Sequence, residues 1–238
     1  MEIKFTTARL TNIVMEVIAA TLIIVFSVSV YNASESMTTA TTQKLDMLKT
    51  AFALQQSSED LTKFVGDYII TNDKKYKNNF NQVAQIRNGI SKRPTLFNSS
   101  YWYLPEDVKI DNHPLTEPSS LTIIIESLPF TELELMLIQE SHFESDELVA
   151  LEHKIFLLVE NGKQEEALKV YYSPEYYHSK VIIMSSLDKL YQSLNERFTR
   201  EIKELQKEQL DALIRLFVVI FLLTIFKMIL PTSYTIRD

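Results

Sequence analysis

The sequence predicts an all-α protein, with an antiparallel four-helix-bundle-like ectodomain and two transmembrane helices continuous with its first and last long helices. Three observations support this fold class. Two apolar runs are long enough to cross a bilayer. Only three glycines occur among 238 residues, whereas hairpin turns, phosphate loops and dinucleotide fingerprints all depend on glycine. Between the runs, apolar residues recur at spacings of three and four, the period of an amphipathic helix.

The two apolar runs predict two membrane spans. Residues 13–30 read IVMEVIAATLIIVFSVSV, with Glu16 as the one charge. As a helix this run reaches about 27 Å, close to the hydrocarbon thickness of a bilayer. The second run, residues 213–230, carries Arg215 and Lys227 within a turn of its ends. Such long side chains extend to the headgroups from these positions, so both charges are tolerable.

Basic residues flank the two runs and predict the orientation of the chain. They are Lys4, Arg9, Lys227 and Arg237. The positive-inside rule then places both chain ends in the cytoplasm. We therefore expect a two-pass protein of the inner membrane, with a cytoplasmic N-terminus (1–12), an extracytoplasmic domain (31–212) and a short cytoplasmic tail (231–238). The alternative is a cleaved signal peptide at the N-terminus, but the first run exceeds the usual signal core and a second span follows.

The composition of residues 31–212 restricts its partners and its stabilisation. This segment holds 28 of the 31 acidic residues and 19 of the 24 basic ones, so it is strongly acidic. An acidic surface argues against nucleic acid as a partner. The chain has no cysteine, so packing rather than disulfides holds the domain together. Its 182 residues are enough to bury a core.

The first half of the ectodomain contains a long helix, a short helix and a loop. Apolar residues at helical spacing run from residue 34 to residue 70, interrupted by the polar patch at 55–60. The sequence TND at 71–73 offers cap residues for a second helix that ends near Gly89. Four prolines between residues 91 and 118 predict a loop.

The second half contains three further helices. Thr131 and Glu134 fit a capping box, opening a helix that runs to about Glu160 and stops at the sequence NG. A short helix covers roughly residues 163–171. Ser173 and Pro174 then have the pattern of an N-cap followed by proline at the first helical position.

The last helix carries an apolar stripe with heptad-like spacing. The stripe consists of Leu187, Leu190, Leu194, Phe198, Ile202 and Leu205. No proline or glycine occurs between residues 175 and 230, so one helix can extend from the ectodomain into the second span. The stripe favours a homodimer. The alternative is that it fills the core of a single chain, because this spacing does not separate the two kinds of packing.

Several ordered segments carry a resemblance to a known family. They are SSEDLTKFVGDYIITNDKKYKNNFNQVAQIRNGISKRP (57–94), the pair Tyr101–Trp102, and the stretch from LPFTELELM to IIMSSLD (128–188). Together they resemble a helical periplasmic sensor domain of bacterial hybrid sensor histidine kinases, chemoreceptors and diguanylate cyclases. The resemblance implies a signalling role, with a second span leading to a kinase or another output module. Only eight residues follow the second run here, so we expect a fragment, a truncated gene, or a separate kinase or chemotaxis-type output protein.

A ligand-binding site is predicted around the proline-rich loop. Aromatic rings beside guanidinium groups enclose small molecules and pair with anionic or carbonyl groups on them. The candidate residues are Arg87, Arg93, Tyr101 and Trp102, joined by Tyr176 and His178 if the start of the last helix lies close to the loop. The alternative is that the aromatics close the end of the bundle. The polar residues Gln55–Ser57 either line the same ligand-binding site or face water.

No catalytic or metal-binding pattern stands out. The four histidines form no HExxH motif, and His142 with Asp146 is an ordinary i, i+4 pair. We therefore expect a chain that is not an enzyme and has no cofactor. The competing function is a membrane-anchored interaction or structural protein without a small-molecule ligand. A polar-lined cavity near Arg87 or Trp102 would favour the sensor, and a broad apolar patch would favour the interaction protein.

Overall fold

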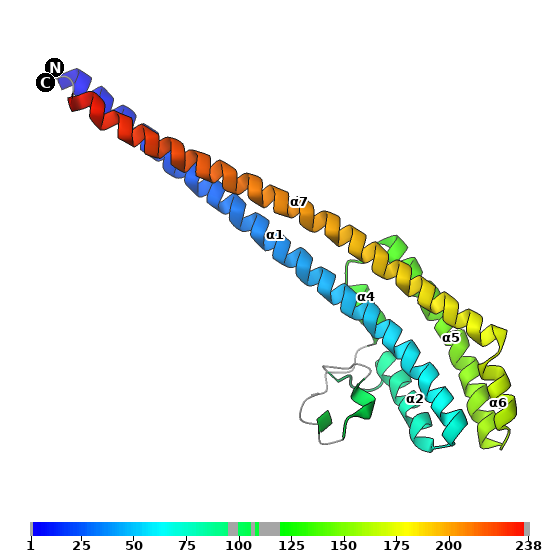
Figure 1. The fold of residues 1–238 in the computed structure, drawn as a ribbon. Helices are drawn as coiled ribbons and strands as arrows, with labels where there is room; N and C mark the ends of the chain where they lie inside the picture. The colour runs from blue at the N-terminus through cyan, green and yellow to red at the C-terminus, as the bar shows by residue number, and fades with distance from the viewer. Residues whose placement is uncertain (1, 95–99, 106–107, 110–119, 236–238) are drawn as a thin grey trace. The chain divides into compact units, whose positions relative to one another are not determined.

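The computed structural model describes residues 2–94, 100–105, 108–109 and 120–235, and these residues are all-helical, with no strand (Figure 1). The helices are α1 (Glu2–Thr71), α2 (Lys74–Arg87), the 3-10 helix η1 (Tyr101–Tyr103), α4 (Leu121–Ser127), α5 (Glu132–Glu160), α6 (Gln164–Tyr171) and α7 (Pro174–Thr235). The predicted all-α class is confirmed. Both predicted long helices are present, because α1 and α7 each continue without a break through one of the apolar runs.

The chain divides into two compact units, one of which is formed by residues 1–42 and 197–238. It contains the first part of α1 and the last part of α7, which include the two apolar runs. Both stretches are long and apolar enough to cross a membrane, judged by length and composition, and 6% of each stretch is buried. The carboxylate of Glu16 lies 3.6 Å from the ammonium of Lys227. This contact joins the two runs as an antiparallel pair.

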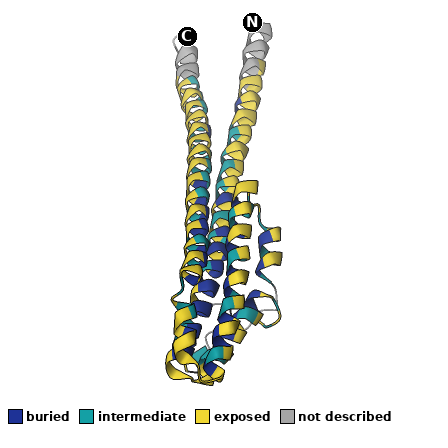
Figure 2. Ribbon diagram, turned by 90° about the vertical axis from the view of Figure 1, so that its right-hand side faces the viewer, coloured by how far each residue is buried: buried dark blue, intermediate teal, exposed yellow. Residues whose placement is uncertain are grey.

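The second unit, residues 43–196, contains most of the buried side chains (Figure 2). Its largest fully buried side chains come from α1, α2, α5 and α7, and they include Phe64, Tyr68, Phe80, Phe156 and Leu190. Phe80 and Phe156 pack edge to face, with ring centroids 4.8 Å apart. Aromatic contacts of this kind, together with apolar burial, account for a core without disulfides.

The helix boundaries of this unit agree with the predicted caps. The side chain of Asp73 accepts a hydrogen bond from the Lys75 backbone at 2.9 Å and opens α2. Thr131 and Glu134 form both hydrogen bonds of the predicted capping box at the start of α5. Gly162, with φ +74, follows α5, and Ser173 accepts a hydrogen bond from Tyr176 N at the start of α7. Local side-chain chemistry therefore sets these boundaries.

The apolar stripe of α7 is largely buried within the chain. Leu187, Leu190, Leu194 and Phe198 are at most 1% exposed, whereas Ile202 and Leu205 are half-buried. Packing inside one chain thus accounts for the first four positions. The homodimer that the stripe favours stays a prediction.

Two segments lie outside the predicted pattern. The helix α4 was not predicted; it is seven residues long and begins where Ser120 accepts a hydrogen bond from Ile123 N. Most of the predicted loop at 91–118, including Pro114 and Pro118, lies outside the described residues. The described part of that loop contains η1, which carries the predicted aromatic residues Tyr101 and Trp102.

Candidate functional site

Trp102 is anchored to α1 through its indole nitrogen. The ring is buried at 6% exposure, and Nε1 donates a hydrogen bond of 3.0 Å to Oδ2 of Asp60. Gln56 Nε2 donates to the same oxygen at 3.4 Å. The indole also packs edge to face on Phe64, with centroids 5.2 Å apart. One side of the predicted loop is therefore fixed to the buried face of α1.

Asp60 is a carboxylate in an unusual place, because only 4% of its surface is exposed. Burial raises its pKa, while the hydrogen bonds from Trp102 and Gln56 and the charge of Lys63 act in the opposite direction. The donors around Asp60 favour the charged form, so the loss of the indole would raise the pKa further. Gln56 and Ser57 of the polar patch are therefore not solvent-facing residues, because each is buried at 5% exposure.

A cavity of about 570 Å³ has Trp102 among the residues that line it. Its walls are formed by α2, η1 and the residues after η1: Lys75, Asn78, Asn79, Trp102, Tyr103, Leu104, Pro105 and Lys109. Two cations, two amides and two aromatic rings are the groups that bind small polar or anionic molecules. This cavity is polar-lined and adjoins Trp102.

A second buried acid, Glu152, lies in the core between α5 and α7. Its side chain is 0% exposed. The hydroxyl of Tyr176 donates a hydrogen bond of 2.9 Å to Oε1, whereas Oε2 has no hydrogen-bond partner among the described residues. Burial raises the pKa of Glu152 to about 8, against the smaller effects of Tyr176, Arg87 and Lys180. At neutral pH this carboxyl is therefore mostly protonated.

Arg87, at the end of α2, contributes one of the charges around Glu152. Its guanidinium is 7% exposed and donates to Ser145 Oγ at 2.6 Å. A longer contact of 3.5 Å joins it to the exposed carboxylate of Asp146. Burial lowers the pKa of Arg87, and the charges of Asp146 and Glu152 oppose that effect. These contacts join α2 to α5 in the core, so Arg87 is not free to close over a ligand.

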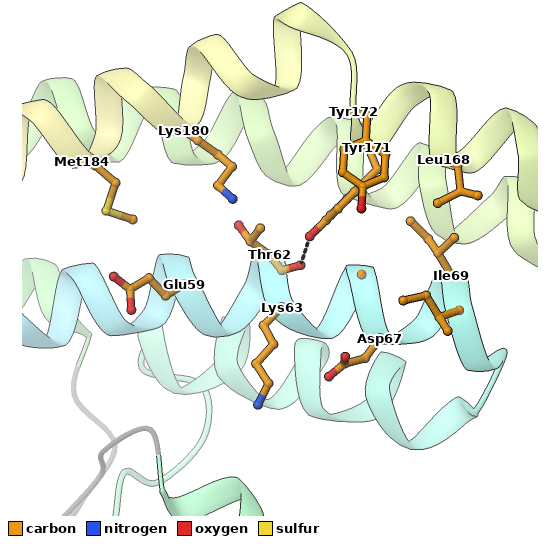
Figure 3. Close-up of a pocket in the computed structure, with 12 residues that line it drawn as sticks. Glu59, Thr62, Lys63, Asp67, Ile69, Leu168, Tyr171, Tyr172, Lys180 and Met184 are labelled. Atoms are coloured by element: carbon orange, nitrogen blue, oxygen red, sulfur yellow. Dashed lines mark hydrogen bonds between the residues drawn. The ribbon is translucent and has the colours of Figure 1, made fainter.

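A groove of about 400 Å³ lies between α1, α6 and α7 (Figure 3). Its lining includes Thr62 from α1, Tyr171 from α6 and Lys180 from α7. The hydroxyl of Tyr171 lies 3.4 Å from the backbone oxygen of Thr62, and a Cβ added to Gly66 would lie 2.8 Å from that hydroxyl. The absence of a side chain at Gly66 thus lets the tyrosine lie directly against α1.

The six predicted site residues fall into separate places. Trp102 lines the polar cavity and Tyr101 packs beside it, with ring centroids 5.3 Å apart. Arg87 and Tyr176 both act on Glu152, by charge and by a hydrogen bond. His178 is exposed on α7, and Arg93 is half-buried after α2.

Comparisons of the chain with family models, with curated proteins and with solved structures found no match. Function must therefore be argued from the site itself. Within the described residues, no group of three or more histidine, aspartate or glutamate side chains could hold a metal ion.

Sequence reasoning missed the two buried acids. A signal for Glu152 is present, because it lies four residues after Leu148 and three before Ile155, on the apolar face of α5. An acid on an apolar helix face indicates a buried polar contact. The partner of that acid depends on tertiary packing and has no local sequence signal.

Proposed function

We propose that this chain is the membrane-anchored input module of a bacterial signal-transduction receptor, which binds a small polar or anionic ligand outside the cytoplasm. Residues 13–30 and 213–230 would serve as the two spans of an inner-membrane protein with both ends in the cytoplasm. The ectodomain would act as a four-helix-bundle-like sensor. A homodimer and a separate kinase or chemotaxis-type protein would complete the receptor.

The observation that carries this proposal is the link between the cavity and α1. Trp102 forms a wall of the cavity and is hydrogen-bonded to the buried Asp60 of α1. A ligand that stacks on the indole or pairs with Lys75 and Lys109 therefore acts on a residue attached to the helix that contains the first apolar run. The hydrogen bond between Trp102 and Asp60 therefore links the ligand cavity to the packing of α1.

The ligand would act by favouring one of two arrangements of the helices. A shift from 1:99 to 99:1 requires the ligand to discriminate between the two states by about 5.5 kcal/mol. A hydrogen bond to a charged group contributes about 1.5–3 kcal/mol. Two such bonds to the lysines, together with aromatic contact, are of the required size.

Binding can be tested through Trp102, because it is the only tryptophan of the chain. The full-length protein in nanodiscs would be titrated with a panel of carboxylates, sugar phosphates and sugars while tryptophan emission is recorded. A compound from this panel should change the emission, and Lys109→Met should weaken its binding. The control is Lys169→Met, an exposed lysine of α6 outside the cavity. An unchanged emission with every compound would contradict the proposal.

Signal transmission needs a second measurement. Single cysteines placed in residues 213–230 would be crosslinked between copies of the chain, with and without the compound that changes the emission. A ligand-dependent pattern is expected, and a pattern that stays the same at saturation would exclude transmission through α7. The cysteine-free natural sequence provides a clean background for this assay.

An interaction protein is the second candidate, and exposed apolar side chains on α5 favour it. Leu133, Met136 and Phe143 are 58–65% exposed and recur at helical spacing. Exposed apolar residues on one helix face are typical of protein contacts. If Phe143→Ser changes the oligomeric mass while no compound binds at Trp102, the interaction function is the correct one.

A further inference from the structure

The groove between α1, α6 and α7 differs from the Trp102 cavity in its charge, because the Trp102 cavity is lined, among the described residues, by two lysines and no acidic residue. It lies wholly within the unit of residues 43–196, and its 400 Å³ volume falls in the range of small-molecule sites, about 300–1,000 Å³. Its lining contains two acidic and two basic side chains, so its formal charge is zero. A groove with both signs of charge and no excess of either is poorly suited to a dianion.

The charged groups differ in where they point. In Figure 3, Lys180 extends from α7 toward Thr62 on α1, and Glu59 lies on the α1 side of the groove. Lys63 and Asp67 extend to the other side of α1, away from α7. The groove therefore presents one cation and one anion on facing walls.

These two charges are not paired with each other. No ion pair or hydrogen bond is formed by the ammonium of Lys180 among the described residues, and Glu59 accepts one hydrogen bond, at 2.8 Å from Gln55. Opposite charges that face each other across a gap can be bridged by a molecule that carries both charges. Charge-assisted hydrogen bonds at each end would then fix its orientation.

Apart from Thr62, the rest of the lining is apolar or aromatic. Ile69 and Leu168 lie at one end of the groove, and Met184 lies beside Lys180 (Figure 3). Tyr171 closes the groove against Gly66. An apolar side chain on a ligand bound at Lys180 would therefore lie against Met184.

We propose that this groove is a second binding site, which takes a small zwitterion that carries an ammonium group, a carboxylate and an apolar body. The carboxylate is held by Lys180, the ammonium by Glu59, and the apolar body by Met184, which lies beside Lys180. The site is separate from the cavity at Trp102 and does not depend on it. Its position between α1 and α7 allows the ligand to change the contact between these helices.

The test is calorimetric titration of the full-length chain in nanodiscs with three matched probes. L-leucine carries both charges, 4-methylpentanoate lacks the ammonium, and 3-methylbutylamine lacks the carboxylate. Leucine should bind at least about tenfold more tightly than either single-charge probe, equivalent to about 1.4 kcal/mol. The measurements should be made at about pH 6, because Lys180 also acts on Glu152, which is protonated at that pH in the folded chain.

Two variants and two controls locate the site. Lys180→Met and Glu59→Gln should each weaken leucine binding about tenfold. Lys169→Met and Glu165→Gln make the same charge changes on exposed positions of α6 that do not line the groove, and they should leave binding unchanged. Circular dichroism verifies that each variant is folded.

The outcomes separate clearly. Equal affinity for leucine and the two single-charge probes, or leucine binding that survives both groove variants, would overturn the proposal. So would the absence of binding by leucine, phenylalanine and glycine betaine at millimolar concentration. The result at Trp102 has no bearing on these outcomes, because the groove variants lie outside that cavity.

Discussion

Replacement of Glu152 by glutamine should remove most of the pH dependence of stability in the ectodomain. Burial raises the pKa of this carboxyl from 4.5 to about 8. Between these two values the folded chain holds a proton that the unfolded chain has released. Stability is therefore highest at low pH and falls as pH rises through this window.

The size of the effect follows from the two pKa values. Between about pH 5.5 and pH 7.5 the folded state loses roughly 2 to 3 kcal/mol relative to the unfolded state. For a chain of 238 residues this corresponds to a melting temperature lower by roughly 4 to 12 °C. Glu152→Gln keeps a neutral group that can accept the hydrogen bond from Tyr176. Its stability should change little between the two pH values, so its advantage in melting temperature over the wild type should be larger at the upper pH than at the lower pH.

The assay is thermal unfolding of the full-length chain in detergent, followed by the emission of Trp102 at both pH values. Glu147→Gln is the matched control, because Glu147 is an exposed carboxylate on the same helix. This control should keep the wild-type pH dependence. If the melting temperature of Glu152→Gln falls with pH as steeply as that of the wild type, or if the variant is less stable at the upper pH, the buried-acid reasoning is wrong.

Three further variants test single contacts. Gly66→Ala should be more stabilising in the Tyr171→Phe background than alone in thermal melts, because its Cβ would lie 2.8 Å from the Tyr171 hydroxyl and this contact opposes the gain in helix propensity of about 1 kcal/mol. Thr131→Ala should cost about 1 kcal/mol by breaking the capping box of α5, measured by the urea midpoint. Trp102→Phe should cost about 1–3 kcal/mol, measured by circular dichroism, because it removes the donor to buried Asp60, and the loss should grow as pH rises.

The helices could be predicted because their boundaries depend on a few adjacent residues. The capping box at Thr131 and the cap at Asp73 need only a side chain and a backbone amide two or three positions away. The two apolar runs are equally local, because length and composition alone define them. The helix α4 was missed since seven residues carry less than two turns of periodic signal.

The candidate site could be predicted only in part, because its contacts join residues far apart in the chain. Trp102 and Asp60 are 42 positions apart, and Arg87 and Ser145 are 58 apart. Aromatic and guanidinium residues near a loop identified Trp102 as a wall of a cavity. The same reasoning grouped Arg87 with that loop, whereas its guanidinium is bound to α5. Residue type indicated the chemistry, and tertiary packing decided the location.

The proposed sensing mechanism depends on where helix breakers are placed. The one glycine of α1, Gly66, is C-terminal to Asp60. No glycine or proline therefore interrupts α1 between the first apolar run (residues 13–30) and Asp60. In α7 no glycine or proline lies between Lys180 and residue 213. A change at either residue would therefore enter a helix that no glycine or proline interrupts on the way to an apolar run. Insertion of two glycines after residue 34 should leave ligand binding at Trp102 intact, because binding depends on the local packing of residues 43–196. The same insertion should abolish ligand-dependent crosslinking, because transmission depends on the helix between those residues and the membrane. If crosslinking still responds to ligand in the insertion variant, α1 does not transmit the signal.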